Sequence, residues 1–192
     1  MSNSLNRKIQ FGNIIEESRL GGPQLRMFNL ALSLNKKIDM TLIMPSQNSK
    51  NLKTKCKSFN IKFLAVDLTT LSRNWISIIK YVFLFPIEVI KLSLLFNKYK
   101  FDIIHVSGGS WQIKGVVAAK LVGKKVVWEL NDTYVPKVIR VIFSLISDMA
   151  DVYIYASYRS KKYYKKLIPY NKKSCVIQSP VDVNLFNPSL TI

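Results

Sequence analysis

Residues 101–130 read FDIIHVSGGSWQIKGVVAAKLVGKKVVWEL. Two runs rich in Ile and Val, 101–106 and 125–130, flank a segment with helical character. That segment, 110–122, begins with a serine suited to cap a helix, and a glycine follows it as a stop signal. The two runs alternate only weakly between apolar and polar residues, which is typical of strands covered on both faces. The stretch therefore predicts a strand, a helix and a second strand of a parallel sheet.

The same alternation of strands and helices extends over the rest of the chain. Helices are expected at 23–35, where proline stands at the first helical position, and at 136–149. The second is apolar nearly all round, so we expect it to be deeply packed. Five further strands are expected at 9–15, 40–44, 61–66, 152–155 and 175–177. The fold class predicted is α/β: a Rossmann-like, doubly wound, mostly parallel sheet with helices on both faces, which binds ligands at the carboxyl ends of its strands.

The composition limits the classes of protein to consider. A chain of 192 residues that is 48% hydrophobic can bury one good core, so we expect one domain. Its 29 Lys and Arg against 11 Asp and Glu give a net charge of +18, which favours nucleic acid, an acidic membrane surface or phosphorylated substrates as partners. Two distant cysteines and a single histidine indicate neither a disulfide framework nor a zinc site. With no secretory signal at the start, the sequence predicts a cytoplasmic protein.

Three segments bear on membrane contact and surface structure. Segment 75–96 is long and apolar enough to suggest a membrane span, but it carries three charged residues and a proline, so we expect it to be buried or interfacial. Segment 157–173 has seven Lys and Arg, four Tyr and no acid, which fits a solvated face or contact with anionic headgroups. Segment 47–62 is polar with five lysines, and we expect an exposed excursion there.

A glycine turn follows the first predicted strand and runs directly into a helix. Gly21 and Gly22 stand immediately before Pro23. The free amides and the positive end of the helix dipole suit a phosphate or carboxylate, although a simple tight turn fits the same residues. The GxGxxG fingerprint of dinucleotide-binding enzymes is absent, which disfavours a nicotinamide cofactor.

The chain's one histidine, His105, lies near the end of the fourth predicted strand, followed by Gly108 and Gly109. Both an acid–base role and a hydrogen-bonded core histidine fit this position.

A dense polar group ends the fifth predicted strand: Glu129, Asn131, Asp132 and Thr133. A buried sheet rarely places such residues at a strand end without use, which indicates a binding or catalytic site. The alternative is that Asp132 or Thr133 caps the helix that follows.

These features, taken in order, resemble the N-terminal domain of a family 4 glycosyltransferase with the GT-B fold. The pattern opens with the glycine turn before a helix and continues with Asp-Ile-Ile-His at 102–105 and Val-Val-Trp-Glu-Leu-Asn-Asp at 126–132. An Ala-Asp strand leading to a serine follows at 150–157. The most specific part is VIQSPVDVNLFNP at 176–188, which is similar to the family's crossover into the donor-binding domain.

The resemblance also divides the chain. Residues 1–178 correspond to the N-terminal Rossmann-like domain and 179–192 to the start of the interdomain linker. The second domain, which binds the donor in the family, is absent from the sequence. Two residues depart from the pattern: Asn131 stands where many members carry a histidine, and Pro180 replaces a common glycine. The first departure puts the role of that histidine in doubt.

The resemblance implies sugar transfer from a nucleotide-sugar to an acceptor, typically with retention at the anomeric carbon. The nucleotide-sugar is a co-substrate, and neither a metal nor a cofactor is required. Catalytic roles would fall to Asn131, Asp132 and His105. Substrate-binding roles would fall to Gly21, Gly22, Gly108, Gly109, Glu129 and Thr133.

The resemblance also implies partners. Many relatives build surface polysaccharides on lipid-linked acceptors, so a lipid-linked or saccharide acceptor and an anionic membrane surface are expected, with the protein peripheral at the inner face of the cytoplasmic membrane. A separate C-terminal glycosyltransferase polypeptide would supply the donor-binding half. Two alternatives remain: an inactive remnant that only binds acceptor or membrane, and a basic nucleic-acid-binding protein. The last ranks well below, because no RNP motif, zinc finger or helix-turn-helix is recognisable.

Overall fold

A seven-stranded, wholly parallel sheet forms the centre of the molecule, in the order β3-β2-β1-β4-β5-β6-β7. The computed structural model describes residues 7–17, 19–71 and 74–179. All seven predicted strands are confirmed. The runs of β1, β2, β4 and β5 are largely buried between layers of helices, whereas β7 at the edge of the sheet is mostly exposed. Their bounds are β1 Gln10–Ile14, β2 Asp39–Pro45, β3 Phe63–Val66, β4 Ile103–Val106, β5 Lys125–Leu130, β6 Val152–Tyr155 and β7 Lys173–Val176.

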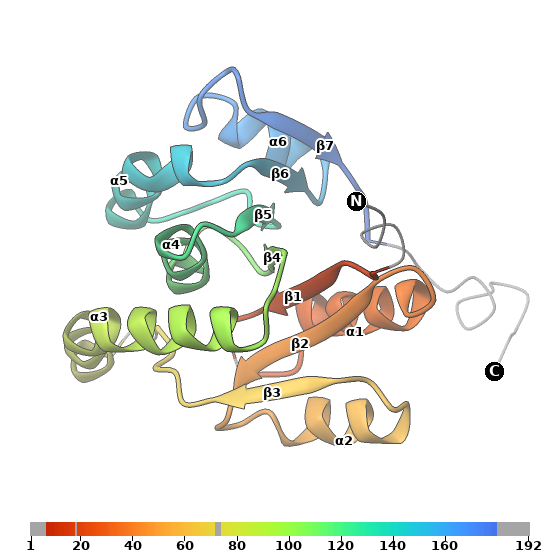
Figure 1. Ribbon diagram of the computed structural model, residues 1–192. Helices are drawn as coiled ribbons and strands as arrows, with labels where there is room; N and C mark the ends of the chain where they lie inside the picture. Colours follow the sequence, from red (N-terminus) through yellow and green to blue (C-terminus); the bar gives the residue numbers. More distant parts are fainter. Residues whose placement is uncertain (1–6, 18, 72–73, 180–192) are drawn as a thin grey trace, which may run out of the picture.

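Helices cover both faces of this sheet (Figure 1). One face carries a core of mainly α1 and α2 side chains over β1 and β2, and the other carries a larger core beneath α3, α4, α5 and α6. The bounds are α1 Gly22–Leu34, α2 Lys50–Ser58, α3 Trp75–Lys98, α4 Ile113–Leu121, α5 Lys137–Ile146 and α6 Tyr158–Tyr164, with a short 3₁₀ turn at Ser147–Met149. The predicted doubly wound α/β class is therefore confirmed.

The strand order changes direction between β1 and β4. From β1 the chain winds outward to β2 and β3, and it then returns to β4 and winds the other way to β7. In open parallel sheets the crevice at such a switch point, at the carboxyl ends of the strands, is where ligands bind.

Two local predictions were wrong. The helix expected over 110–122 begins only at Ile113, with Gln112 as an N-cap that makes no side-chain capping bond. Ser110 does not cap it, because its hydroxyl donates instead to Asp132. The expected excursion at 47–62 contains α2, which buries Leu52 and Cys56 on one side and leaves its lysines outside.

The helix expected over 136–149 is not deeply packed. Of the residues in α5, only Phe143 is buried, while Val138, Val141 and Leu145 are 60–78% exposed. Because α5 forms part of an outer layer and contacts the sheet along one side only, the apolar residues on its other sides have no protein to pack against (Figure 1).

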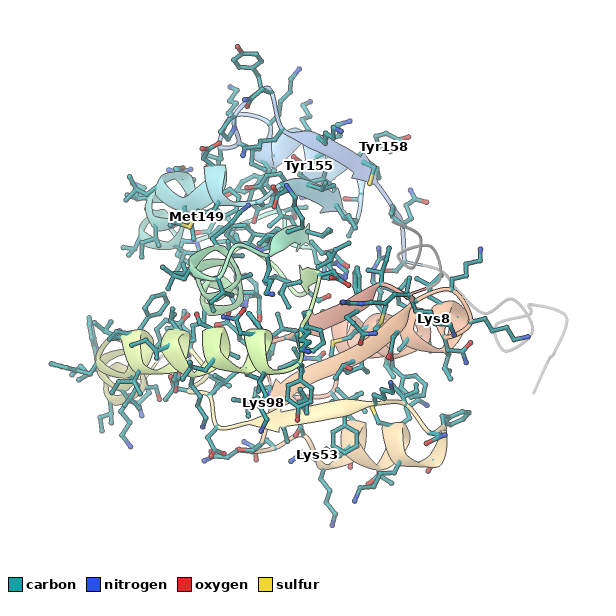
Figure 2. All side chains as sticks on the ribbon, in the orientation of Figure 1. Lys8, Lys53, Lys98, Met149, Tyr155 and Tyr158 are labelled. Carbon is teal, nitrogen blue, oxygen red and sulfur yellow. The ribbon has the colours of Figure 1, made fainter. Side chains whose placement is uncertain are left out.

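The long helix α3 extends beyond the sheet. Lys91 lies within 3.6 Å of Asp67, just after β3 ends, so the half of α3 before this residue runs past the carboxyl ends of the strands (Figure 1). Side chains radiate outward around this half (Figure 2), and Trp75 and Phe83 are 78% and 75% exposed. Within the described ranges no helix is both long and apolar enough to cross a membrane.

The basic segment after β6 is divided between core and surface. Tyr164 of α6 is fully buried in the larger core and Tyr163 packs against that core, whereas Tyr158 and Tyr170 are exposed. Two of the four tyrosines of this segment therefore pack into the core, and the other two face outward. Lys161 and Lys162, in the last turn of α6, lie on its exposed side.

Candidate functional site

The predicted site residues lie at the carboxyl edge of the sheet, around the switch point. The loop after β1 carries Gly21 and Gly22, the loop after β4 carries Gly108 and Gly109, and β5 ends in the polar stretch that begins at Glu129. The structure divides them between two faces of the sheet, because successive side chains of a strand point to opposite sides.

His105 and Glu129 lie together on the face covered by α1. His105 Nε2 is 3.3 Å from Glu129 Oε2, and Arg26 of α1 brings its Nε to 3.0 Å from Glu129 Oε1. All three side chains are largely buried. Burial acts to raise the pKa of the Glu129 carboxyl, but contact with His105 and the charge of Arg26 outweigh it and hold that pKa below its ordinary value. Glu129 therefore stays ionised at neutral pH.

Several polar atoms in this region have no hydrogen-bond partner among the described residues. Asn13, His105, Glu129 and Asn131 form, with Arg26, what we call the His105 cluster. The atoms concerned are Asn13 Nδ2, both ring nitrogens of His105, Glu129 Oε1 and Asn131 Oδ1. The contacts of Glu129 are ion pairs without hydrogen-bond geometry. Buried polar groups are nearly always hydrogen-bonded, so a concentration of unpaired ones indicates a place where ligand or water supplies the partners.

Asp132 lies in a separate group on the opposite face. Its carboxylate accepts hydrogen bonds from Ser110 Oγ at 3.1 Å and from the Tyr164 hydroxyl. Burial raises the pKa of this carboxyl, although the bonds from Tyr164 and Ser110 act against the rise. The alternative that Asp132 or Thr133 caps α5 was wrong, because the N-cap is Pro136 and no side chain caps it. Thr133 is half-buried in the loop before that helix.

Gly108 and Gly109 set the shape of the loop after β4. Their φ angles are +112° and +133°, a region that residues with a side chain rarely adopt. A Cβ on Gly109 would stand 3.2 Å from Asp132 Oδ2, and the Gly109 carbonyl accepts a 3.0 Å bond from Trp128 Nε1. These glycines therefore allow the loop to pass close to Asp132.

Gly21 and Gly22 begin α1, as the glycine turn predicts. The Gly21 N–H donates to Gln24 Oε1 at 3.1 Å, and the space around Gly22 is open. The dipole of α1 is positive at this end, which suits an anionic group.

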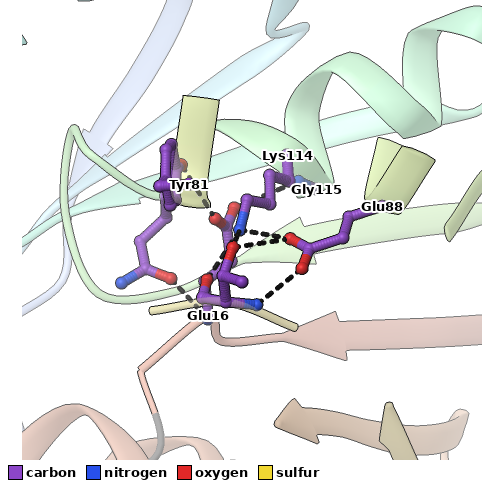
Figure 3. Close-up of polar contacts among 7 residues, drawn as sticks. Glu16, Tyr81, Glu88, Lys114 and Gly115 are labelled. Carbon is purple, nitrogen blue, oxygen red and sulfur yellow. Dashed lines mark hydrogen bonds and ion pairs between the residues drawn. The ribbon is translucent and has the colours of Figure 1, made fainter. Parts of the chain in front are cut away.

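A second buried polar group joins the loop after β1 to α3 and α4. We call Glu16, Thr69, Tyr81, Glu88 and Lys114 the Lys114 cluster (Figure 3). Lys114 Nζ is 2.5 Å from Glu88 Oε2, donates to the Thr69 carbonyl at 2.6 Å, and lies 3.9 Å from the centre of the Tyr81 ring. The charged groups of this cluster thus have partners.

Glu16 completes this second group. One of its carboxylate oxygens accepts from the Gly115 N–H at 3.1 Å and the other from the Tyr81 hydroxyl at 3.4 Å. Burial raises the pKa of Glu16 to about 7, although the charge of Lys114 and the bond from Gly115 act to lower it.

Sequence reasoning missed Asn13, Arg26, Tyr164 and the Lys114 cluster. A signal was present for the last of these, since Glu88 is the one acidic residue of the mostly apolar α3 and Lys114 stands in the mostly apolar α4, where a buried charge needs a partner. No comparable signal marks Arg26, which meets Glu129 only through the tertiary fold. Among the described residues, no group of three or more His, Cys, Asp or Glu side chains is arranged to hold a metal ion.

Comparison with known proteins identifies the family. The family model of Glycosyltransferase Family 4 matches residues 20–185. The chain belongs to glycosyltransferase family 4. This family 4 chain is similar in fold to a glycosyltransferase from Rickettsia africae, with a TM-score of 0.73 and 16% identity over 97% of this chain and 47% of that one.

Two further solved structures are similar to this chain in fold. HepE from Anabaena, solved in complex with UDP and glucose, gives a TM-score of 0.69 at 15% identity over 94% of this chain and 48% of that one. MurG from Acinetobacter baumannii gives 0.60 at 16% identity over 88% and 44%. The family 4 chain therefore spans about half the length of these relatives and forms one half of a GT-B fold. No curated protein sequence matches it significantly.

Proposed function

We propose that this chain is the acceptor-side half of a glycosyltransferase. Together with a donor-binding half, it transfers a sugar from a nucleotide-sugar to a lipid-linked or saccharide acceptor in surface polysaccharide synthesis. The observation that carries the proposal is the set of buried polar atoms without a hydrogen bond on Asn13, His105, Glu129 and Asn131, beside the switch point of a family 4 domain. The complex of HepE with UDP and glucose supports a nucleotide-sugar as donor.

The proposed reaction exchanges one bond to the anomeric carbon for another. The bond from this carbon to the diphosphate oxygen breaks, and the nucleoside diphosphate leaves with the electron pair. The acceptor hydroxyl forms the new bond and releases its proton. Oriented polar groups favour such a transfer because they hold the reacting atoms in place and stabilise developing charge.

Each site residue has a proposed part in this reaction. The open turn at Gly21 and Gly22 lets the backbone approach the donor phosphates, and Asn131 with Glu129 binds sugar hydroxyls. His105, in contact with Glu129, handles the proton of the acceptor hydroxyl. Asp132 orients a hydroxyl from the other side of the sheet edge, in a loop shaped by Gly108, Gly109 and Thr133.

The test is transfer of radiolabelled sugar to a membrane extract. The chain is assayed alone and then with a separately expressed family 4 donor-binding half from the same source. We expect activity only on mixing, and Asp132→Ala should lower it on the order of hundredfold, the usual scale for a group that acts in the transition state.

Two controls accompany this assay. Asp148→Ala removes an exposed carboxylate that pairs with Lys172, and it should leave transfer unchanged. Asp132→Asn keeps the size of the side chain and one of the two oxygen acceptors that Ser110 and Tyr164 use, so it disturbs the fold less than Asp132→Ala while it removes the carboxylate. No activity on mixing, from a folded chain, would favour the acceptor-binding remnant instead.

We further propose that the chain works at an anionic membrane surface. Support comes from its charge of +18 and from the exposed apolar residues of α3 and α5. Each basic residue near such a surface contributes about 1 kcal/mol. Vesicle sedimentation checks this, and equal binding to neutral and anionic vesicles would contradict it.

A further inference from the structure

A groove of about 750 Å³ lies between the projecting half of α3 and the loops that follow β2 and β3. This volume is within the range of about 300–1,000 Å³ that small-molecule sites occupy. One wall is apolar and comes mainly from α3, and the opposite side carries amide and hydroxyl groups. The apolar wall consists of Leu68, Ile79, Phe83, Leu84 and Ile87. The opposite side includes Gln47, Asn48 and Thr70, and α3 itself adds the hydroxyl of Ser77.

The charges around the groove are unequally paired. Asp67 accepts from the Ser46 hydroxyl and lies 3.6 Å from Lys91, so its charge is balanced. Glu88 is balanced by Lys114 at 2.5 Å. The remaining charged side chain of the lining is Lys80, which is exposed and has no ion-pair partner among the described residues. The groove therefore has one unpaired positive charge beside an apolar wall.

This arrangement indicates the chemistry of an occupant. A long hydrocarbon chain gains free energy from burial against the α3 wall in proportion to the area removed from water. A phosphate ester at its end would pair with Lys80 and accept hydrogen bonds from the hydroxyls of Thr70 and Ser77. A neutral lipid would leave Lys80 unpaired, and a free phosphate would leave the apolar wall in water.

We propose that this groove binds the phosphate ester of a single hydrophobic chain. The groove opens at the carboxyl edge of the sheet, the same edge as the His105 cluster, because α3 continues past the strand ends (Figure 1). The inference rests on the proposed function, in which the bound molecule is the lipid carrier of the acceptor. It adds a substrate class and a position that are independent of the nucleotide-sugar.

The test is calorimetric titration of the chain with decyl phosphate below its micelle concentration. Decanol and inorganic phosphate serve as the two halves of the ligand. We expect decyl phosphate to bind at least tenfold more tightly than decanol, and inorganic phosphate to show no saturable binding. Phe83→Ser should weaken decyl phosphate at least tenfold, while Lys80→Ala should bring decyl phosphate and decanol within threefold of each other.

Matched controls come from the same helix. Val82 is 62% exposed but does not line the groove, and Lys98 lies in the last turn of α3, away from it. Val82→Ser and Lys98→Ala should each change the affinity less than twofold. An equal loss in Phe83→Ser and Val82→Ser would mean adsorption to an apolar surface and would overturn the proposal. So would unchanged affinity in Phe83→Ser.

Two further outcomes distinguish this proposal from membrane contact by α3 and from the transferase proposal. If the chain binds anionic vesicles but not monomeric decyl phosphate, α3 is assigned to membrane contact. The proposal that the groove binds a phosphate ester is then overturned. If the mixed halves transfer sugar but decyl phosphate does not bind, the groove proposal fails and the transferase proposal stands. If decyl phosphate binds but the mixed halves transfer no sugar, the groove proposal stands and the transferase proposal fails.

Discussion

Two buried polar clusters occupy the same edge of this sheet and differ in how well they are satisfied. In the Lys114 cluster the carboxylates of Glu16 and Glu88 and the ammonium of Lys114 all have partners within the chain. In the His105 cluster, four side chains keep a buried polar atom that makes no hydrogen bond to a described residue, although Glu129 forms ion pairs with Arg26 and His105. A satisfied network holds elements together, whereas an unsatisfied one is arranged for a molecule that the chain does not contain.

The strongest test of this contrast is Lys114→Met. The substitution conserves much of the volume but removes the charge that balances buried Glu88, and it deprives Glu16 of its nearest cation. Removing one member of a buried pair costs about 3–5 kcal/mol, and we expect a loss of that order in the free energy of unfolding. Urea denaturation measures it, with the exposed Lys98→Met as control. A loss below about 1 kcal/mol would show that the cluster does not hold α3 to α4.

The next effect is a pH dependence that originates at Glu16. The folded chain keeps this proton up to about pH 7, whereas the unfolded chain releases it near pH 4.5. Because the folded state binds more protons between these values, the free energy of unfolding should fall as pH rises through this window, by up to about 3 kcal/mol. Glu16→Gln should remove that contribution. Urea denaturation at several pH values measures the free energy of unfolding of both chains. The same slope of this free energy against pH in both chains would contradict the assignment to Glu16.

The smallest expected effect concerns the other cluster. His105→Gln should lower the free energy of unfolding by about 1 kcal/mol, less than Lys114→Met, because Glu129 keeps Arg26 as its partner. The loss comes from the contact of His105 with Glu129 and from the edge contact of the ring with Phe11. A loss as large as that of Lys114→Met would show that His105 stabilises the fold as strongly as the Lys114 cluster does. The two clusters would then not differ in this respect.

The sequence predicts the sheet well and the packing of individual helices less well. Runs such as 101–106 are apolar enough to mark strands buried on both sides, and their order fixed the fold class. The pattern in α5 has a polar side with Lys137, Arg140 and Ser144, but its apolar side is too wide to show which residues would meet the core. In the structure Phe143 is buried there with Ile139 and Ile146 beside it, and Val138, Val141 and Leu145 stay exposed.

The site could be predicted in part. The polar residues at the end of β5 marked the edge of the sheet where the His105 cluster and Asp132 lie, and strand alternation would have separated Glu129 from Trp128. The approach of Arg26 to Glu129 could not be predicted, because it depends on how α1 lies across the sheet. The crossover residues 180–192 lie outside the described residues, so the predicted linker and its departure at Pro180 remain predictions.

The order of the strands also matters while the chain is being made. Phe11 of β1 pairs with Ile103 of β4, so the inner edge of β1 waits for a partner that is synthesised about ninety residues later. At roughly 5–20 residues per second, that interval is on the order of 5–20 s. During it the apolar α3 emerges before β4 and α4 exist to receive it. The nascent chain therefore combines an open sheet edge with an unpacked apolar helix, and it depends on prompt completion or on chaperones to avoid aggregation.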